Sequence, residues 1–240
     1  MGDLAIICGA TGGLGPAIVD AFARRGDRVI AVARSRAEVS QLASAYPGIV
    51  SGDTADLTSR LAVDDLWERI DRIGVPRWVV NAVGGFKGGT VAESTPDDFG
   101  SMLDLNLGSA WWSCRAAARR MGRPSGSPTS SGEGQDRGCI VNVAARAALF
   151  AEPGQAAYAV AKAGVIQLTR VLAAELKSSG VRVNAVLPAV IDTPANRRSM
   201  PEKLLLKAVP PAEIASLVAF LCSDDAAAIT GAAIPAYGRF

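Results

Sequence analysis

The sequence predicts a single-domain α/β Rossmann fold with a doubly wound, seven-stranded parallel sheet, and three observations support this. Short runs rich in Val and Ile alternate with helical patterns along the chain. A glycine-rich turn lies between the first apolar run and the first helical pattern. The 240 residues, 49% of them hydrophobic, suit one domain (residues 1–240) with a full core.

The elements follow one another in a regular order. The predicted strands are LAIIC (4–8), RVIAVA (28–33), GIVSGD (48–53), RWVVNA (77–82), CIVNVA (139–144), VRVNAVLP (181–188) and a last strand at 232–236. The predicted helices cover 13–25, 37–45, 60–72, 96–121, 155–178 and 211–222. Right-handed crossovers between parallel strands place helices on both faces and give the strand order 3-2-1-4-5-6-7.

Two segments depart from this rhythm. Residues 122–138 are rich in Gly, Ser and Pro and nearly free of apolar residues, so a flexible insertion is expected there. Residues 188–210 are polar and lie between prolines, which indicates a substrate loop or lid. A solvated loop with its arginines facing water is the alternative for this second segment.

Composition excludes several classes of function. A net charge of +2 indicates no nucleic-acid or membrane-surface partner, and no apolar run has the length of a membrane span. The first residues do not resemble a signal peptide, and the four scattered cysteines are expected to be buried thiols, so a cytoplasmic protein is expected. The chain has no histidine, which removes Ser-His-Asp chemistry and imidazole-based zinc sites; no metal is expected.

The turn after the first strand predicts a dinucleotide site. Gly9, Gly13 and Gly15 allow a tight turn in front of a helix whose N–H groups and dipole favour a pyrophosphate. A turn used only for packing is the alternative. The second strand ends at Ala33, where an NAD site usually has a carboxylate, and Arg34 and Arg36 follow. A guanidinium binds a 2′-phosphate, so NADPH is favoured, unless both arginines are merely solvated.

With these residues in view, the chain resembles the short-chain dehydrogenase/reductase superfamily over nearly its whole length. The spaced glycines fit its glycine loop, and Tyr158 with Lys162 fits its YxxxK motif. Asn106 matches the family's catalytic asparagine, which supports a proton-relay water. The resemblance implies cofactor contacts from Gly9, Thr11, Gly13, Leu14, Gly15, Arg34, Arg36, Asp56, Leu57, Asn81, Ala82, Tyr158, Lys162, Pro188, Ile191 and Thr193.

Spacing supports the YxxxK assignment independently. Residues i and i+4 share one helix face, so Lys162 can place its ammonium near the Tyr158 phenol. A nearby cation stabilises a phenolate, and we therefore expect the pKa of Tyr158 to be lowered toward neutral. The alternative is a Tyr and a Lys on an ordinary amphipathic helix.

One position departs from the superfamily pattern. Ala145 stands where a serine is usual, thirteen residues before Tyr158. That serine normally hydrogen-bonds a substrate carbonyl oxygen. Three interpretations follow: a protein that binds NADPH without turnover, a hydroxyl supplied from elsewhere in the fold, or a substrate that does not need the serine. An iminium carbon is already electrophilic, and its reduction creates no oxyanion.

A second resemblance favours the last interpretation. Within the superfamily, the chain is most similar to quinonoid dihydropteridine reductases, which have alanine in place of the serine. The similarity lies in VGGFKGG (83–89), ARAALFAEPG (145–154) and LPAVIDTPANRRSMPE (187–202). Those reductases prefer NADH and carry an acidic residue where this chain has Ala33, so the substrate is expected to differ. The resemblance implies substrate contacts from Phe86, Ala145, Asn196 and Met200.

The sequence therefore predicts an NADPH-dependent reductase of an imine, iminium or quinonoid C=N bond in a small molecule. The alternatives are a carbonyl reductase and a non-catalytic NADPH sensor. Phe86 is expected to stack on a flat or cationic ring, or else to pack locally. Trp111 and Trp112 are expected at a helix or subunit interface, and a homodimer or homotetramer is expected from the resemblance.

Overall fold

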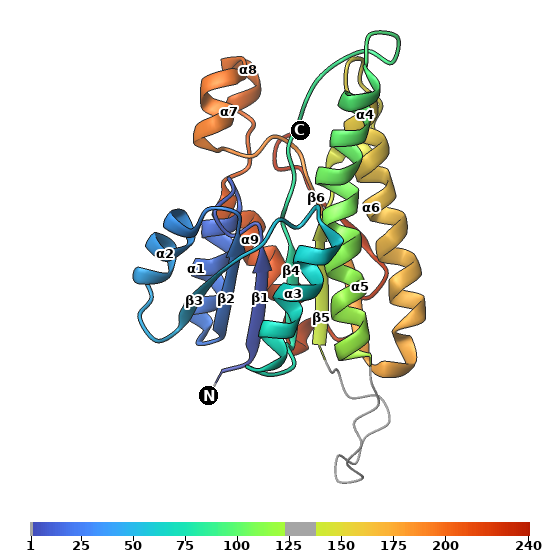
Figure 1. The fold of residues 1–240 in the computed structure, drawn as a ribbon. Coiled ribbons are helices and arrows are strands. Elements are labelled where there is room, and N and C mark those ends of the chain that lie inside the picture. Colours follow the sequence, from blue (N-terminus) through green and yellow to red (C-terminus); the bar gives the residue numbers. More distant parts are fainter. Residues whose placement is uncertain (1, 123–137) are drawn as a thin grey trace.

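The computed structural model describes residues 2–122 and 138–240, and these residues form the predicted sheet. Seven parallel strands are paired in the order β3-β2-β1-β4-β5-β6-β7 (Figure 1). The strands are β1 Leu4–Cys8, β2 Arg28–Ala33, β3 Val50–Thr54, β4 Trp78–Asn81, β5 Gly138–Val143, β6 Val181–Pro188 and β7 Ala233–Ala236. The predicted fold class and strand order are confirmed.

Helices cover both faces of the sheet (Figure 1). The α-helices are α1 Gly15–Arg25, α2 Arg36–Ser44, α3 Arg60–Asp71, α4 Pro96–Leu103, α5 Ser109–Met121, α6 Ala156–Glu175, α7 Pro194–Ser199, α8 Glu202–Leu205 and α9 Pro211–Leu221. Short helices of other types are η1 Asp104–Gly108, η2 Arg146–Ala148, η3 Lys177–Ser179 and η4 Asp224–Ala226.

Alternation along the strands divides the core into two layers. In β1, Ala5 and Ile7 pack with α1 and α9, whereas Leu4, Ile6 and Cys8 pack with α3 and α5. Successive side chains of a strand point to opposite faces, so a strand buried on both faces is apolar at every position. This explains the continuous Val- and Ile-rich runs of the sequence.

Two predicted segments differ in detail. The expected helix over 96–121 is interrupted by the π-helical η1, because one extra residue is inserted into the turn there. The expected polar loop at 188–210 contains the short helices α7 and α8, beyond the carboxyl ends of the strands (Figure 1). The two ends of this segment are joined by a hydrogen bond from the Asp192 N–H to the Val209 carbonyl (2.9 Å).

The predicted flexible insertion at 122–138 lies, except for its two end residues, outside the described residues. Gly122 follows the end of α5, and Gly138 begins β5 with a φ of 151°. All four cysteines are buried and free, as predicted. Burial raises the pKa of the Cys8 thiol to about 11 and that of Cys114 to about 12, so neither is a ready nucleophile.

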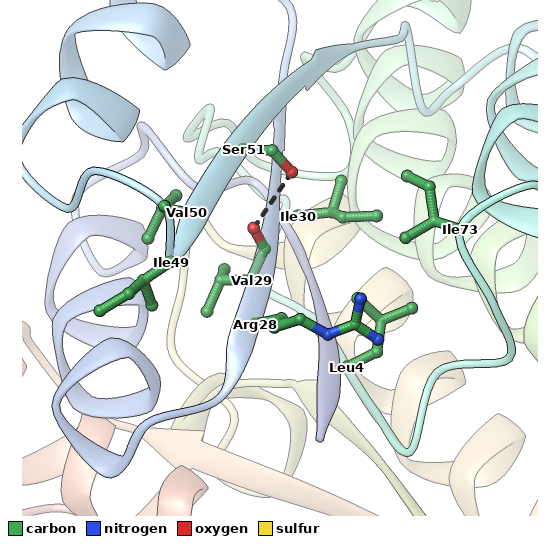
Figure 2. Close-up of a pocket in the computed structure, with 9 residues that line it drawn as sticks. Leu4, Arg28, Val29, Ile30, Ile49, Val50, Ser51 and Ile73 are labelled. Carbon is green, nitrogen blue, oxygen red and sulfur yellow. Dashed lines mark hydrogen bonds between the residues drawn. The ribbon is translucent and has the colours of Figure 1, made fainter. Parts of the chain in front are cut away.

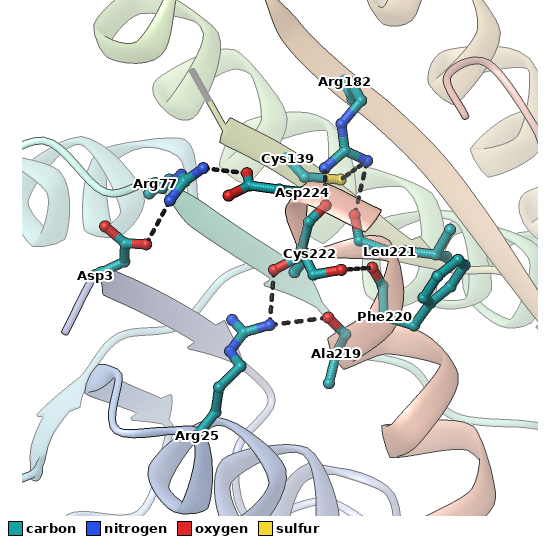
Figure 3. Close-up of polar contacts among 11 residues, drawn as sticks. Asp3, Arg25, Arg77, Cys139, Arg182, Ala219, Phe220, Leu221, Cys222 and Asp224 are labelled. Carbon is teal, nitrogen blue, oxygen red and sulfur yellow. Dashed lines mark hydrogen bonds and ion pairs between the residues drawn. The ribbon is translucent and has the colours of Figure 1, made fainter. Parts of the chain in front are cut away.

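The amino ends of the strands hold a group of arginines that bind helix carbonyls (Figure 3). Arg25, in the last turn of α1, donates to the Cys222 carbonyl (2.7 Å). Arg182, at the start of β6, donates to the carbonyls of Leu221 (2.7 Å) and Ser223 (3.0 Å). Because the last carbonyls of a helix have no intrahelical partner, these two cations close the end of α9.

A shallow hollow opens at the same edge of the sheet, where β1, β2 and β3 begin (Figure 2). Its lining residues are Leu4, Arg28, Val29, Ile30, Gly48, Ile49, Val50, Ser51 and Ile73. None of these is a predicted site residue. The predicted site residues instead follow the carboxyl ends of the strands, where ligands bind in open α/β sheets.

Candidate functional site

The glycine loop between β1 and α1 is shaped by two close backbone approaches. Gly9 has a φ of 83°, and a Cβ there would lie 2.9 Å from the Ala82 carbonyl carbon. A Cβ on Gly15 would lie 2.3 Å from the Gly9 carbonyl oxygen. Only glycine fits either position. The loop, here called the cradle, is therefore a tight turn in which backbone packs on backbone. A turn of this kind in front of a helix suits a dinucleotide pyrophosphate.

The helix that follows the cradle begins without a side-chain cap. Leu14, the residue before α1, makes no side-chain cap hydrogen bond, and Pro16 lies in the first turn. Pro16 has no N–H, and the Gly15 N–H donates within the loop to the Gly12 carbonyl (3.1 Å), so the start of α1 offers the loop chiefly the positive end of its dipole. A positive helix end beside a glycine turn fits a pyrophosphate, and the residues present suit a dinucleotide cofactor.

The loop after β6 lies directly against the glycine loop. A Cβ on Gly13 would lie 2.7 Å from the Thr193 Cγ2 atom. Thr193 is buried, and its hydroxyl accepts the N–H of Asn196 (3.2 Å) to cap α7. Pro188 ends β6, and Ile191 pairs with Val209. The structure thus brings two segments together that are 180 positions apart in the sequence.

The predicted adenosine-side residues follow the ends of β2 and β3. Arg34 is exposed, whereas Arg36 Nη2 donates to the Thr54 hydroxyl (3.4 Å). Leu57 is buried, and Asp56 accepts the N–H and hydroxyl of Thr58 in a local turn. The two arginines therefore differ: Arg36 leans toward β3, and Arg34 keeps its guanidinium at the surface.

Asn81 and Ala82 take different places at the end of β4. The Asn81 amide is buried and donates to Asn142 Oδ1 (2.8 Å) and to the Cys114 sulfur (3.3 Å). Asn142 in turn donates to the Thr169 hydroxyl (2.9 Å). This network ties β4, β5, α5 and α6 together below the site. The Ala82 backbone, by contrast, lies against Gly9 in the cradle.

Lys162 is buried on α6, and its position is set by the sheet. It is 3% exposed, and its Nζ donates to the Val143 carbonyl at the end of β5 (2.9 Å). Burial lowers the pKa of Lys162 to about 8, because desolvation penalises the ammonium. The lysine therefore carries its charge at neutral pH but loses it more readily than an exposed lysine.

Asn106 lies in the π-helical segment η1, next to Lys162. Its Oδ1 accepts the Gly85 N–H (3.2 Å), and its Nδ2 donates to the Gly85 carbonyl (3.0 Å). A Cβ on Gly84 would lie 2.8 Å from Asn106 Oδ1 and 3.0 Å from Lys162 Nζ. The missing side chain at Gly84 therefore lets the asparagine, the lysine and the loop after β4 meet.

Tyr158 departs from the expectation on one point. Burial raises the pKa of Tyr158 to about 12, and does not lower it toward neutral. The prediction was wrong because Lys162 Nζ lies 5.9 Å from the Tyr158 ring centroid and is held by a carbonyl, so the cost of burying a phenolate prevails. The phenol is thus a protonated hydrogen-bond donor over the whole neutral range.

Phe86 packs directly on Tyr158. Its ring meets the Tyr158 ring edge-to-face, with centroids 5.3 Å apart, and Phe86 is still 56% exposed. The loop that carries it is fastened where the Gly89 N–H donates to the Gly154 carbonyl (2.9 Å). Phe86 therefore packs locally, whereas its stacking on a ligand ring stays a prediction.

Ala145 begins the loop after β5 and is 6% exposed. Ala144 and Ala148, close by in the chain, carry no hydroxyl either. The guanidinium of Arg146 lies over the Phe150 ring, 4.5 Å from its centroid. This part of the loop therefore presents apolar atoms rather than a hydroxyl.

A second aromatic pair was missed in the sequence. Phe150 meets Tyr237 edge-to-face at 5.9 Å, and Tyr237 follows β7 at the carboxyl edge. The position of Tyr237 directly after the last strand is the signal that could have found it. The predicted contact Asn196 instead donates to the Ile191 carbonyl (2.8 Å), and Met200 is half-buried after α7.

Comparison with known proteins completes the description of the site. Residues 9–238 match a family model described as enoyl-(acyl carrier protein) reductase. The chain is 33% identical to a D-threitol dehydrogenase of Mycolicibacterium smegmatis, over 96% of this chain and 90% of that protein. It is 30% identical to the 3-oxoacyl-(acyl-carrier-protein) reductase FabG of Thermotoga maritima, over 97% and 95%. It is also 30% identical to carbonyl reductase family member 4 of Danio rerio, over 92% and 91%.

Proposed function

We propose that this chain, which belongs to the short-chain dehydrogenase/reductase superfamily, is an NADPH-dependent reductase of a carbon–nitrogen double bond. Its membership makes it an oxidoreductase that uses a nicotinamide cofactor. The observation that carries the finer proposal is the buried, hydroxyl-free start of the loop at Ala145. The substrate class is an imine, an iminium (including one formed from a hemiaminal) or a quinonoid ring, as in the dihydropteridine reductases that the chain resembles.

The choice of NADPH rests on the end of β2. When bound, this cofactor supplies the two electrons and the hydrogen that the substrate carbon receives. Arg34 is exposed beside the strand end, and Ala33 adds no carboxylate that would repel a 2′-phosphate. Gly9 and Gly15 would hold the pyrophosphate, and Lys162 would hold the ribose nearest the nicotinamide.

The residues near Tyr158 suit a substrate that brings its own positive charge. A carbonyl substrate develops an oxyanion, which needs hydrogen-bond donors beyond Tyr158, and Ala145 offers none. A protonated imine ends as a neutral amine, so the missing donor costs little. Tyr158, whose pKa is raised to about 12, remains protonated and orients the substrate as a donor or passes on a proton. Asn106 fixes the loop at Gly85 and supports the proton path.

Phe86 supports the same substrate class. It is 56% exposed at the carboxyl edge of the sheet, and its ring is held edge-on to Tyr158. An aromatic face attracts a cation or a flat electron-poor ring. The α7–α8 segment, including Asn196 and Met200, would close over such a ligand as a lid.

Reduction of a carbonyl group is the second candidate. The relatives named above include a 3-oxoacyl reductase and a carbonyl reductase, and those names favour it. Under this alternative, Tyr158 alone would donate to the carbonyl oxygen, and the chain would tolerate Ala145 at a cost in rate.

An Ala145→Ser variant separates the two candidates. Both proteins are assayed for NADPH oxidation with a quinonoid dihydropterin, a cyclic iminium and a panel of ketones. One restored oxyanion donor is worth on the order of 10²–10³ in rate where the reaction needs it, so we expect at least a tenfold gain on ketones. On the iminium and the quinonoid ring we expect a change of less than about twofold, because no oxyanion forms.

Two outcomes would decide against the proposal. If the wild-type protein reduced ketones and no substrate with a C=N bond, its function would be carbonyl reduction. A large gain of Ala145→Ser on the best wild-type substrate would show that the reaction does use a serine donor. Thermal melting of both proteins serves as the control, since Ala145 is buried and the added hydroxyl must be accommodated.

We further propose a cytoplasmic homodimer or homotetramer built through α5 and α6. Trp111 on α5 is 50% exposed, and Val160 and Val171 on α6 are 55% and 45% exposed. Trp112 is half-buried and packs against the core layer that contains α3 and α5. Within the described residues, no helix has both the length and the hydrophobicity of a membrane span.

A further inference from the structure

Two side chains in the first turn of α2 contact different segments of the site. Arg36 reaches the Thr54 hydroxyl at the end of β3 (3.4 Å). Glu38, in the same turn of α2, accepts the hydroxyl of Thr11 in the glycine loop (3.1 Å). The side chain of Ser35 fixes this arrangement, because it accepts the Glu38 N–H (3.3 Å). The side chain that faces the cradle from α2 is therefore a carboxylate.

We propose that Glu38 is a specificity-determining residue that limits the preference of this pocket for NADPH over NADH. The inference rests on the proposed cofactor site and adds a residue that neither the motif nor the strand-end rule assigns. Arg34 attracts a 2′-phosphate at the end of β2, while the Glu38 carboxylate, held at the glycine loop by Thr11, repels it. A carboxylate also accepts hydrogen bonds from ribose hydroxyls, which favours the cofactor that lacks the phosphate.

The contact with Thr11 makes the effect specific to this carboxylate. Glu38 is exposed, but its carboxylate accepts a hydrogen bond from Thr11, a residue of the glycine loop itself. Ala33 occupies the position where NAD-binding sites usually carry their acid, and Glu38 supplies an acid five residues later. The end of β2 thus favours NADPH and the start of α2 favours NADH. The preference of the pocket for one cofactor over the other is the sum of these two effects.

The test compares wild-type protein with Glu38→Gln and Glu38→Ala. Dissociation constants for NADPH and NADH are measured by the change in nicotinamide fluorescence, which needs no substrate and no turnover. Removing one negative charge near the 2′-phosphate is expected to lower the dissociation constant for NADPH about threefold to tenfold at low salt. NADH is expected to bind equally well or more weakly. The gain for NADPH should shrink as ionic strength rises, which a purely structural role would not produce.

A matched control is available elsewhere in the chain. Glu93 accepts the hydroxyl of Thr90 (2.6 Å) in an exposed loop, so Glu93→Gln removes the same kind of contact and charge away from α2. Both dissociation constants should stay unchanged in this control. A ratio of NADPH to NADH affinity that changes less than twofold in both Glu38 variants would overturn the inference. A wild-type protein that binds neither cofactor would instead overturn the proposed function.

Discussion

The two edges of the parallel sheet both use buried or half-buried cations, but in different ways. At the amino edge, Arg182 is 5% exposed and donates to two carbonyls at the end of α9 (Figure 3). At the carboxyl edge, Lys162 is 3% exposed and donates to the single carbonyl of Val143. An arginine has five donors in a fixed fork, whereas a lysine is a point charge whose pKa shifts readily when it is buried.

This contrast teaches which edge serves stability and which serves chemistry. At the amino edge the guanidinium satisfies carbonyls that would otherwise be left without donors. At the carboxyl edge burial moves the pKa of Lys162 down to about 8 and that of Tyr158 up to about 12. Perturbed titratable groups of this kind are typical of functional sites. Three experiments test the contrast, in order of decreasing expected effect.

Lys162→Met removes the cation from the carboxyl edge. We expect the reductase rate to fall by about 10²–10⁴, the range that a positioned acid–base system contributes. The free energy of unfolding should fall little, because a buried ammonium is replaced by an apolar chain of similar length. Urea unfolding and NADPH oxidation are measured on the same preparation. Full activity in a folded Lys162→Met protein would contradict the assignment of this edge to chemistry.

Arg182→Met removes the cation from the amino edge. The carbonyls of Leu221 and Ser223 lose their donors, and at about 1–3 kcal/mol for each unmet group the free energy of unfolding should fall by roughly 2–6 kcal/mol. The rate per folded molecule should not change. Arg170→Met, on the exposed side of α6, is the control and should cost less than about 0.5 kcal/mol. An unchanged urea midpoint in Arg182→Met would show that this edge is not structural.

The pH dependence of stability sharpens the same comparison. Lys162 has a pKa of about 8 in the folded protein against 10.5 for a free lysine, so the unfolded chain binds more protons between these values. Stability therefore rises with pH in this window, by about 2 kcal/mol between pH 8 and pH 10. The pKa of Tyr158, about 12 against 10.0, acts only above pH 10, where it lowers stability as pH rises.

The difference between wild-type protein and Lys162→Met isolates this contribution. Unfolding by urea is measured at pH 7, 8, 9 and 10. The free energy of unfolding of the wild type should rise relative to that of Lys162→Met as the pH rises, since only the wild type buries an ionisable group at position 162. A gap that stays flat over this range would mean that Lys162 is not desolvated as the structure has it.

Much of the fold followed from local patterns in the sequence. Val- and Ile-rich runs predicted the strands because a strand buried on both faces must be apolar throughout, as β1 is from Leu4 to Cys8. The π-helical segment around Asn106 was not predicted, because one inserted residue barely alters a helical pattern. The helices α7 and α8 were not predicted either, since short polar helices carry no apolar periodicity.

The site divided in the same way. Tyr158 and Lys162 were predicted from spacing, because a helix places residues four apart on one face. The glycines were predicted from their place between a strand and a helix, and Asn106 from the family resemblance. Contacts between distant segments were not found: Thr11 with Glu38 and Phe150 with Tyr237 depend on how the chain ends meet at one edge. No spacing rule connects such residues before the sheet is assembled.

By itself, the sequence determined the strand order, the glycine cradle, the tyrosine–lysine pair and the absence of a hydroxyl at Ala145. Only the tertiary structure decided how that pair titrates. The sequence predicted that Lys162 would lower the pKa of Tyr158. The fold reverses the direction, because it desolvates the half-buried phenol and directs the buried lysine to the Val143 carbonyl. Burial is a property of the assembled core, whereas spacing is a property of the chain, and a pKa depends on both.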